Sequence, residues 1–393
     1  MTDAAIGVMT AIIGGDVCPI GRNEPLFKAG DAKAIFSDLL PEIQAADLSI
    51  INMECPLIRQ PSPIGKVGPA LHVAEACVQG LVNAGIKLVG LANNHAMDHG
   101  PLGLETTMAA CNQNGIGTVG AGADIAAAAR IVVWEVRGVR LGILAVAEHE
   151  FGIAGTDAPG VNPLDVMAFV RTVEASHSTY DKLLVLVHGG NEHYPYPRPG
   201  LMDVCRFLVE QGANAVICQH SHSAGCMETY RGAPIIYGQG NFIFDSPSKY
   251  ADWPDGLLVR LTVPLEGNIR HELIPLRQSD AIPGARRQTG AAAEKFLAGF
   301  DARSKAIQEP GFVERQFEIF CRAHKRYYLH SLHGKPGILR RVAGKLDLLH
   351  YLDSRYKQQL RLNLIRCESH HEALLGVLSA EANRLEKPVM QQP

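Results

Sequence analysis

Short apolar segments alternate with helix-like segments from the N-terminus to about residue 265. Strands rich in Val, Ile and Leu with helices between them are typical of a sheet that is covered on both faces. The dipeptides Arg137-Gly138 and Arg231-Gly232 lie between apolar runs and predict hairpin turns, so part of the sheet should be antiparallel. The expected strands are Met9–Gly14, Leu48–Asn52, Lys87–Ala92, Ile131–Val136, Val139–Ala147, Leu183–His188, Ala215–Cys218, Pro234–Tyr237 and Leu257–Val263.

The pattern changes near residue 280, which divides the chain into two predicted parts. The stretch Ser279–Thr289 is polar, contains Gly and Pro, and is typical of a linker or long loop. After it the periodicity is helical to about Leu385. We therefore expect an α/β domain with a mixed sheet or paired sheets in residues 1–280, and a helical C-terminal extension in residues 281–393. The expected helices of the first part are Ala32–Ala45, Ala74–Ala84, Pro101–Asn114, Pro163–His177 and Pro199–Gly212.

Composition excludes several classes of protein. A formal net charge of −3 gives no sign of nucleic-acid binding. The nine cysteines are odd in number and scattered, without a CxxC pair, which favours reduced thiols over a disulfide scaffold. The N-terminal apolar stretch is too short to span a bilayer and has no basic residues before it, and no other segment reaches membrane length. We expect a cytoplasmic protein without an integral membrane segment; the sequence does not indicate an oligomeric state.

One segment of the predicted extension is locally basic. Residues 311–366 carry twelve Lys or Arg against four Asp or Glu. The plain interpretation is a solvated helical face. The functional interpretation is a cap that attracts an anionic substrate or surface.

Polar side chains follow several of the apolar runs at the point where each predicted strand ends. In α/β sheets, ligands gather at the loops that follow the carboxyl ends of the strands, so these side chains should share one edge. Oxygen and imidazole donors without thiolate suit Mn, Fe, Zn or a similar divalent ion, and a central carboxylate can bridge two such ions. The candidate metal ligands are Asp16, Glu54, Asn94, His188, His220 and His222.

Five ordered motifs contain these residues: GGD (14–16), NMECPL (52–57), LANNHAMDHG (91–100), HGGNEHYPYP (188–197) and CQHSHSAGCMETYRGAPIIYGQGNFIFD (218–245). Together they resemble the CapA family, also called the poly-γ-glutamate capsule-synthesis or PGA_cap family, over roughly residues 8–265. That family is similar to the calcineurin-like metallophosphoesterases. The resemblance therefore implies a β-sandwich flanked by helices and a metal-dependent activity linked to capsule or exopolysaccharide polymers.

The resemblance also implies a role for each residue. Asp16 and His222 would bind a first metal, Asn94, His188 and His220 a second metal, and Glu54 would bridge the two. His95 matches a general acid or an electrostatic stabiliser of the leaving group, and Asp98 could orient its imidazole. One position departs from the metallophosphoesterase pattern, because Cys18 stands where a histidine is usual. The first site could then lack a ligand or use the Cys18 thiolate, although a buried structural thiol is the first interpretation of Cys18. The first metal could be weakly held or absent, and a one-metal enzyme is an open alternative.

Further residues near the motifs are weaker candidates. Arg22 could clamp a carboxylate or phosphate, and Glu192 could act as a base or support a ligand; a surface loop is the alternative for each. Asn241 is expected to order the edge. His149 could face the site or pack in a loop. His72, His177 and His324 have no motif context and are interpreted as surface or structural. The same interpretation comes first for His370 and His371, although one of them could fold back and supply the donor that Cys18 does not provide.

Three functions fit these patterns. The first is a metallohydrolase in which a metal-activated water attacks a phosphoester or a peptide-type amide, with one or two Mn, Zn or Fe ions. The second is an epimerase that removes and returns a proton at a peptide α-carbon, because the resemblance reaches peptide epimerases and the altered first motif weakens the phosphoesterase pattern. The third is a non-catalytic accessory protein of polymer synthesis. The expected substrate is an anionic polymer, a peptide or a phosphoester.

Overall fold

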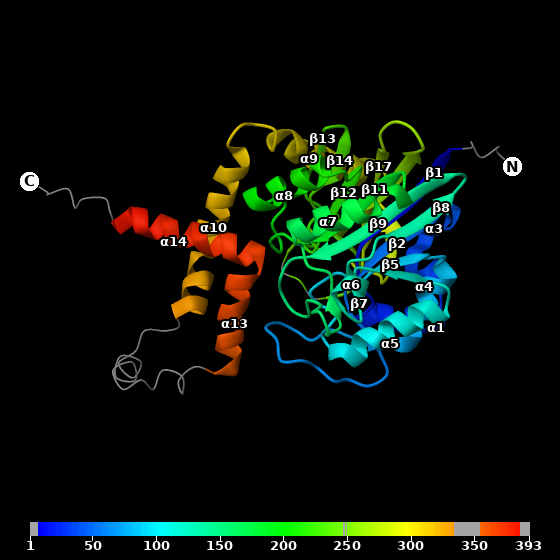
Figure 1. Cartoon of the computed structure of the whole chain (residues 1–393), viewed down its shortest axis with the longest axis horizontal. Helices are drawn as coiled ribbons and strands as arrows, with labels where there is room; N and C mark the ends of the chain where they lie inside the picture. The colour runs from blue at the N-terminus through cyan, green and yellow to red at the C-terminus, as the bar shows by residue number, and fades with distance from the viewer. Residues whose placement is uncertain (1–6, 247, 249, 334–353, 386–393) are drawn as a thin grey trace, which may run out of the picture.

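Two mixed β-sheets pack against each other at the centre of the computed structural model, which describes residues 7–246, 248, 250–333 and 354–385 (Figure 1). The first sheet has the order β18-β17-β16-β1-β2-β5-β6, and β15 also pairs with β1. Parallel pairing of β1, β2, β5 and β6 brings their carboxyl ends to one edge. Its strands are β1 (Val8–Cys18), β2 (Leu48–Met53), β5 (Leu88–Gly90), β6 (Gly117–Val119), β15 (Asn241–Phe244), β16 (Asp255–Pro264), β17 (Arg270–Gln278) and β18 (Ala285–Arg287).

The second sheet has the order β13-β14-β12-β11-β9-β8. Both predicted hairpins are present at its edges, and Arg137, Gly138, Arg231 and Gly232 all have positive φ, as a type I′ turn requires. The four strands between them run parallel. The strands are β8 (Val132–Val136), β9 (Val139–Ala147), β11 (Lys182–His188), β12 (Ala215–Gln219), β13 (Met227–Tyr230) and β14 (Ala233–Ile236).

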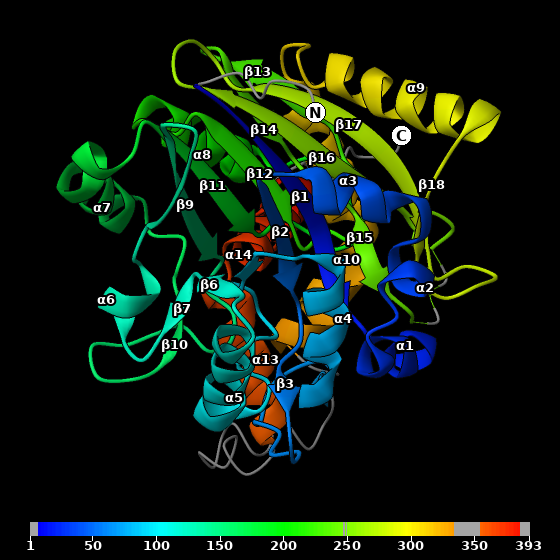
Figure 2. The ribbon, with the colours of Figure 1, turned by 90° about the vertical axis from the view of Figure 1, so that its right-hand side faces the viewer.

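Helices cover the outer faces of both sheets, and one apolar cluster fills the space between the sheets (Figure 2). That inner cluster joins side chains such as Ile13 of β1 to Leu141 and Leu186 of the second sheet. Burial of such large aliphatic side chains contributes about 1.5–3 kcal/mol each. The covering helices are α1 (Glu24–Ala29), α2 (Ala32–Phe36), α3 (Leu40–Ala45), α4 (Val78–Ala84) and α5 (Gly100–Gln113) on the first sheet, and α7 (Val166–Ser176) and α8 (Pro199–Glu210) on the second.

The C-terminal part is helical. After α9 (Gly290–Ala306), which lies along β13 and β17, the helices α10 (Phe312–His333), α13 (Arg355–Arg366) and α14 (Glu368–Leu385) form a group beside the sandwich (Figure 1). They share a small apolar core with Tyr194 of the sandwich, to which Cys321, Leu364 and Val377 contribute. None of the described helices is long and apolar enough to cross a membrane.

The predicted fold class, an α/β sandwich flanked by helices with a helical C-terminal part, is confirmed. The division into domains near residue 280 stays a prediction. Two local expectations were wrong. The predicted helix Ala32–Ala45 is broken at Ser37, because Pro41 has no N–H to continue the hydrogen-bond ladder and α3 begins anew around it. The predicted linker contains β18, a three-residue edge strand too short and too charged to show periodicity. All nine cysteines are buried and free.

Candidate metal centre

The carboxyl ends of β1, β2, β11 and β12 meet at one edge of the sandwich and carry four of the candidate ligands. Asp16 lies in β1, where the pairing with β2 is irregular, and Glu54 follows β2 directly. His188 is the last residue of β11, and His220 follows β12. Gly15 explains the GGD motif, because a Cβ there would stand 2.3 Å from the carbonyl oxygen of Gly240. Only a residue without a side chain at position 15 lets the backbone pass this close to Gly240 and place Asp16 at the edge of the sheet.

The first group of donors consists of Glu54, His188 and His220, each of which offers one atom within 4.8 Å of the others. His188 Nε2 lies 3.5 Å from Glu54 Oε1 and 3.0 Å from His220 Nδ1. Asn94 joins them, because its Oδ1 is 3.1 Å from His188 Nε2. This arrangement has the mixed carboxylate, amide and imidazole character that transition-metal sites use.

The second group consists of Asp16, Glu54 and His222, again within 4.8 Å. His222 Nδ1 is 3.5 Å from Asp16 Oδ2, and its Nε2 is 3.8 Å from Glu54 Oε1. The expected ordering residue Asn241 contacts His222 Nδ1 at 2.9 Å through Oδ1 and so holds the ring. Glu54 belongs to both groups, which is the position expected of a bridging carboxylate.

Glu54 provides the strongest sign that a cation fits here. Its side chain is fully buried, and neither carboxylate oxygen has a hydrogen-bond partner. Burial, and next the nearby Asp16, raise the pKa of Glu54 well above its usual value. Burial likewise lowers the pKa of His188 and of His222, which favours the neutral imidazole that binds metals. A divalent cation would relieve the isolated negative charge and satisfy the orphaned oxygens.

Two histidines adopt unusual backbone conformations at this edge. His220 has φ of 94° and His222 has φ of 54°, in the left-handed region that residues with a Cβ rarely occupy. The tight His-Ser-His turn directs both imidazoles toward Glu54. Backbone strain of this kind, on the order of 1–3 kcal/mol per residue, gathers at functional sites.

A polar network behind the ligands was not predicted. Asn52 Nδ2 donates to Asp16 Oδ1 at 2.8 Å and also contacts His188 Nδ1 at 3.2 Å. Asn93 Nδ2 in turn donates to Asn52 Oδ1 at 3.0 Å. Asn52 therefore connects a ligand of each group. It lies inside an apolar strand, and only its polar character in that run distinguishes it in the sequence.

His95 and Asp98 lie beside the candidate ligands. His95 Nδ1 is 2.6 Å from Asp98 Oδ2, and Asp98 also forms a buried ion pair with Lys66. Lys66 Nζ donates to the carbonyl of Asn94 at 2.9 Å. The role of Lys66 was missed, because it lies in a loop without an apolar run before it. The lysine fixes the position of Asp98 and, through it, the ring of His95.

A pocket of about 400 Å³ opens above this edge, and the C-terminal helices form part of its wall. The sandwich contributes His95, Glu192 and Glu150. The helices contribute side chains that the sequence analysis had interpreted as surface or had not considered, namely Phe320, His324, Tyr327, Tyr328, Asn363 and His370. The pocket is therefore built jointly by the two predicted parts of the chain.

Comparison with known proteins identifies the family. The family model described as bacterial capsule synthesis protein PGA_cap matches residues 10–246. The chain belongs to the PGA_cap family. It is 27% identical to the PGA biosynthesis protein CapA of Bacillus subtilis over 70% of this chain and 73% of that protein. It is 30% identical to a polyglutamine synthesis accessory protein of Mycobacterium tuberculosis over 64% of this chain and 70% of that protein.

Among solved structures, a candidate 5′-nucleotidase of Staphylococcus aureus in complex with alpha-ketoglutarate aligns with a TM-score of 0.43 at 13% identity. The alignment covers 75% of this chain and 58% of that chain. The PGA_cap family match ends at residue 246, before the helices that complete the pocket wall.

The other predicted residues of this PGA_cap protein have different surroundings. Cys18 is fully buried, and burial together with a hydrogen bond to Cys55 raises the pKa of its thiol well above the usual value, so it stays a thiol. The guanidinium of Arg22 is directed to Asp245 and to carbonyl groups of 279–281, which gives it partners other than a substrate. Glu192 is exposed to the pocket. His149 pairs with Glu368 of α14.

Proposed function

We propose that this PGA_cap protein is a metal-dependent hydrolase that cleaves a phosphoester or a peptide-type amide. The observation that carries the proposal is the pair of donor groups that share Glu54, whose two buried oxygens lack a hydrogen-bond partner. Asp16, Glu54 and His222 would hold one ion, and Glu54, Asn94, His188 and His220 the other. Mn, Zn or Fe suits these donors. Bound there, a divalent ion supplies Lewis-acid stabilisation of the charge that develops during hydrolysis.

The chain supplies the proton chemistry around that site. His95 lines the pocket, and Asp98 occupies its Nδ1, so Nε2 is the nitrogen left to protonate a leaving group. Glu192 is exposed to the same pocket and is placed to accept a proton. The helical wall excludes water from one side of the substrate, which strengthens electrostatic interactions within the pocket.

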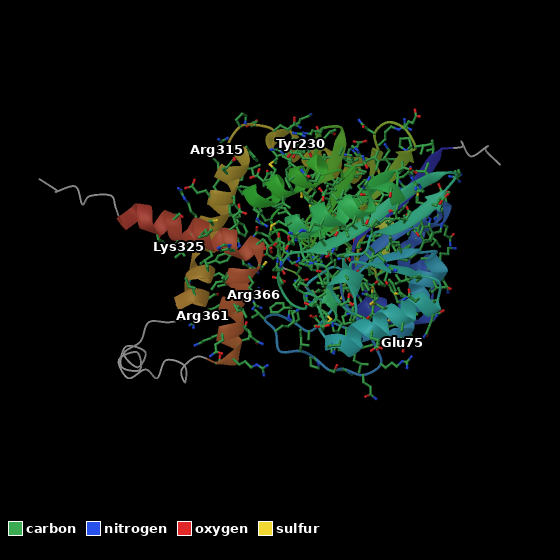
Figure 3. All side chains as sticks on the ribbon, in the orientation of Figure 1. Glu75, Tyr230, Arg315, Lys325, Arg361 and Arg366 are labelled. Atoms are coloured by element: carbon green, nitrogen blue, oxygen red, sulfur yellow. The ribbon has the colours of Figure 1, made fainter. Side chains whose placement is uncertain are left out.

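A basic groove supports an anionic substrate. A cavity of about 520 Å³ lies between α10 and α13, and its described lining includes Arg326, Lys357 and Arg361 but no carboxylate. Arg361 lies where the two helices meet (Figure 3). Tyr327 lines both this groove and the pocket over the metal centre, so one extended chain could occupy the two. Relatives named for PGA and polyglutamine synthesis favour an acidic polymer such as poly-γ-glutamate.

One observation favours epimerisation as a second candidate. Titratable side chains line the pocket from two separate elements, His95 from the sandwich and His324 with Tyr327 from α10. A pair of groups at different walls is what removal and return of an α-proton requires. A non-catalytic accessory role is the remaining alternative, and the unpartnered Glu54 argues against it, because a scaffold gains nothing from a buried orphan carboxylate.

The test begins with the metal content of the purified protein by elemental analysis, followed by assays of Mn- or Zn-loaded enzyme. The substrates are p-nitrophenyl phosphates and short poly-γ-glutamate chains. We expect hydrolysis that His188→Ala abolishes, while His177→Ala, at a histidine on the exposed surface, leaves it unchanged. Deuterium uptake at a peptide α-carbon without cleavage would replace hydrolysis by epimerisation. A protein that binds no divalent ion would overturn both.

A further inference from the structure

Three consecutive residues after β9 meet the junction of α13 and α14. Glu148 Oε2 accepts from the backbone N–H of Ser369 at 3.0 Å. Glu368 accepts from the backbone N–H of His149 at 2.8 Å and pairs with its imidazole. His370 Nε2 lies 3.4 Å from Glu150 Oε1. Residues 148–150 and 368–370 therefore form a clamp that joins the sandwich to the helical wall.

Glu148 is the fixed point of this clamp. It is buried, and its Oε1 accepts from Arg198 Nη2 at 2.8 Å and from the backbone N–H of Gly190 at 3.0 Å. Arg198 also pairs with Glu372 of α14. Both oxygens of Glu148 are hydrogen-bonded, and Arg198 uses Nη1 and Nη2 to join Glu372 and Glu148, while its Nε has no hydrogen-bond partner. The loop that carries Glu150 is therefore fixed both by Arg198 and Gly190 of the sandwich and by Ser369 of α14, which all contact Glu148.

Glu150 reaches from the clamp to the metal centre. Asn94 Nδ2 donates to Glu150 Oε2 at 2.6 Å, and Asn363 of α13 donates to Oε1 at 3.4 Å. A side-chain amide can present either its oxygen or its nitrogen, and only hydrogen bonds decide which one. A carboxylate accepts hydrogen bonds only, so Glu150 fixes Nδ2 of Asn94 on its own side. Oδ1 of Asn94 is left to face His188 and the donor group around Glu54.

We propose that Glu150 is a positioning residue that orients Asn94 for metal binding, and that the helical wall holds Glu150 through His370 and Asn363. The proposal rests on the proposed metal centre. Carboxylates that orient metal ligands typically change metal affinity about 10–100-fold when they are removed. The C-terminal helices, which lie beyond the matched family region, thereby contribute to the metal centre and not only to the pocket.

The test measures Mn²⁺ and Zn²⁺ binding to the full-length protein by isothermal titration calorimetry. Asn94→Ala and Glu150→Ala should each weaken the binding of one ion at least about tenfold. Glu150→Gln retains an oxygen that can accept from Asn94 Nδ2 and should recover most of the affinity. Glu368→Gln is the matched control, because it alters the adjacent pair of the same clamp without touching Asn94 or Glu150, and it should bind as the wild type does.

The outcomes separate the two proposals. If the wild type binds no ion, or if Asn94→Ala binds as well as the wild type, the proposed metal centre is wrong. If Asn94→Ala weakens binding and Glu150→Ala does not, the positioning role is wrong while the centre stands. Should Glu150→Ala fail to fold, Glu150→Asp replaces it. The shorter side chain draws the carboxylate back from Asn94, and unchanged affinity of that variant would overturn the inference.

Discussion

Two regions near the pocket contain buried carboxylates, namely the donor groups around Glu54 and the clamp. The carboxylates of the two regions differ in whether they accept hydrogen bonds. On the sandwich edge, neither oxygen of Glu54 has a partner, and the pKa of Glu54 is raised. In the clamp, Glu148 and Glu150 accept several hydrogen bonds. Burial acts to raise the pKa of each carboxyl, but Arg198 lowers the pKa of Glu148 and His370 lowers that of Glu150, and in both cases the lowering is the larger effect. Similar carboxylates are thus left without hydrogen-bond partners at Glu54 and are fully hydrogen-bonded in the clamp.

This difference supports the proposal that the metal centre is at Glu54 and not in the clamp. Two sets of potential ligand atoms also gather in the clamp, around Cys367 with Glu148 and Glu368 or with Glu150 and His370. Their carboxylates are already engaged, and burial raises the pKa of the Cys367 thiol well above its usual value. Proximity of donors alone therefore does not indicate a metal site. The absence of internal partners around Glu54 is the more informative observation.

The largest expected change in the free energy of unfolding comes from a substitution in the clamp. Glu148→Gln removes one of the two carboxylates that pair with buried Arg198, while Glu372 remains, and it weakens the hydrogen bonds that Glu148 accepts. It should destabilise the metal-free protein by about 3 kcal/mol. Urea denaturation in the presence of a chelator measures this change. A loss below about 1 kcal/mol would show that the clamp is not the rigid network that its hydrogen bonds indicate.

The same Glu-to-Gln substitution at Glu54 should change the free energy of unfolding in the opposite direction. Glu54→Gln removes a buried carboxyl whose oxygens lack hydrogen-bond partners and whose raised pKa costs the folded state stability above the ordinary carboxyl pKa. It should stabilise the metal-free protein at neutral pH by about 1–3 kcal/mol, while metal binding is lost. The same denaturation experiment, with metal content measured in parallel, tests both parts. Cys18→Ala, at another fully buried side chain nearby, is the control and should retain the metal. Destabilisation of the metal-free protein by Glu54→Gln would remove the contrast between the two regions.

A smaller effect is expected in the basic groove of the helical wall. Arg326→Glu combined with Lys357→Glu should weaken the binding of fluorescent poly-γ-glutamate about tenfold at low salt, which corresponds to about 1.4 kcal/mol. Fluorescence anisotropy measures it, and p-nitrophenyl phosphate hydrolysis should not change. Arg171→Glu on α7 is the control for net charge. An equal loss of binding in that control would assign the attraction to the whole surface.

The smallest expected effect is a change in the stability of the clamp with pH. The hydrogen bond with Glu368 raises the pKa of His149 against the opposing effect of burial, and Asp165 and Glu148 add attraction. The pair is therefore fully formed below the ordinary histidine pKa and is lost as pH rises through the raised value. Because His149 is partly exposed, we expect less than about 1 kcal/mol. Hydrogen-exchange protection of residues 367–375 should fall in the wild type as pH rises above the ordinary histidine pKa, and should stay level in Glu368→Gln.

The candidate ligands could be proposed from the sequence because they depend on strand ends. Asp16, His188 and His220 follow or end apolar runs, and parallel strands place such positions at one edge whatever the loops do. Asn52 escaped notice because a polar residue inside a strand has no characteristic spacing. The broken helix at Ser37 was missed for a related reason, since the apolar periodicity continues across the break.

The helical wall could not be predicted in the same way. His370 and His324 belong to amphipathic helices whose docking depends on tertiary contacts, and periodicity shows only which face is apolar. The expectation that His370 could fold back was close to the observed arrangement, but the ring meets Glu150 and not the region of Cys18. Nothing within the segment around Glu150 reveals a partner so distant in the sequence.

That distance has a consequence for folding. The clamp joins residues separated by 219–221 positions, and closing so long a loop is entropically costly until both parts are already ordered. The sandwich closes an even longer loop where Val8 of β1 pairs with Pro264 of β16. We nevertheless expect the helices to dock in a late kinetic phase, because the clamp residues 148–150 follow β9 and are positioned only once that strand is part of its sheet. A newly collapsed molecule would then pass through a state in which the proposed metal ligands are together but the helical wall of the pocket has not yet docked.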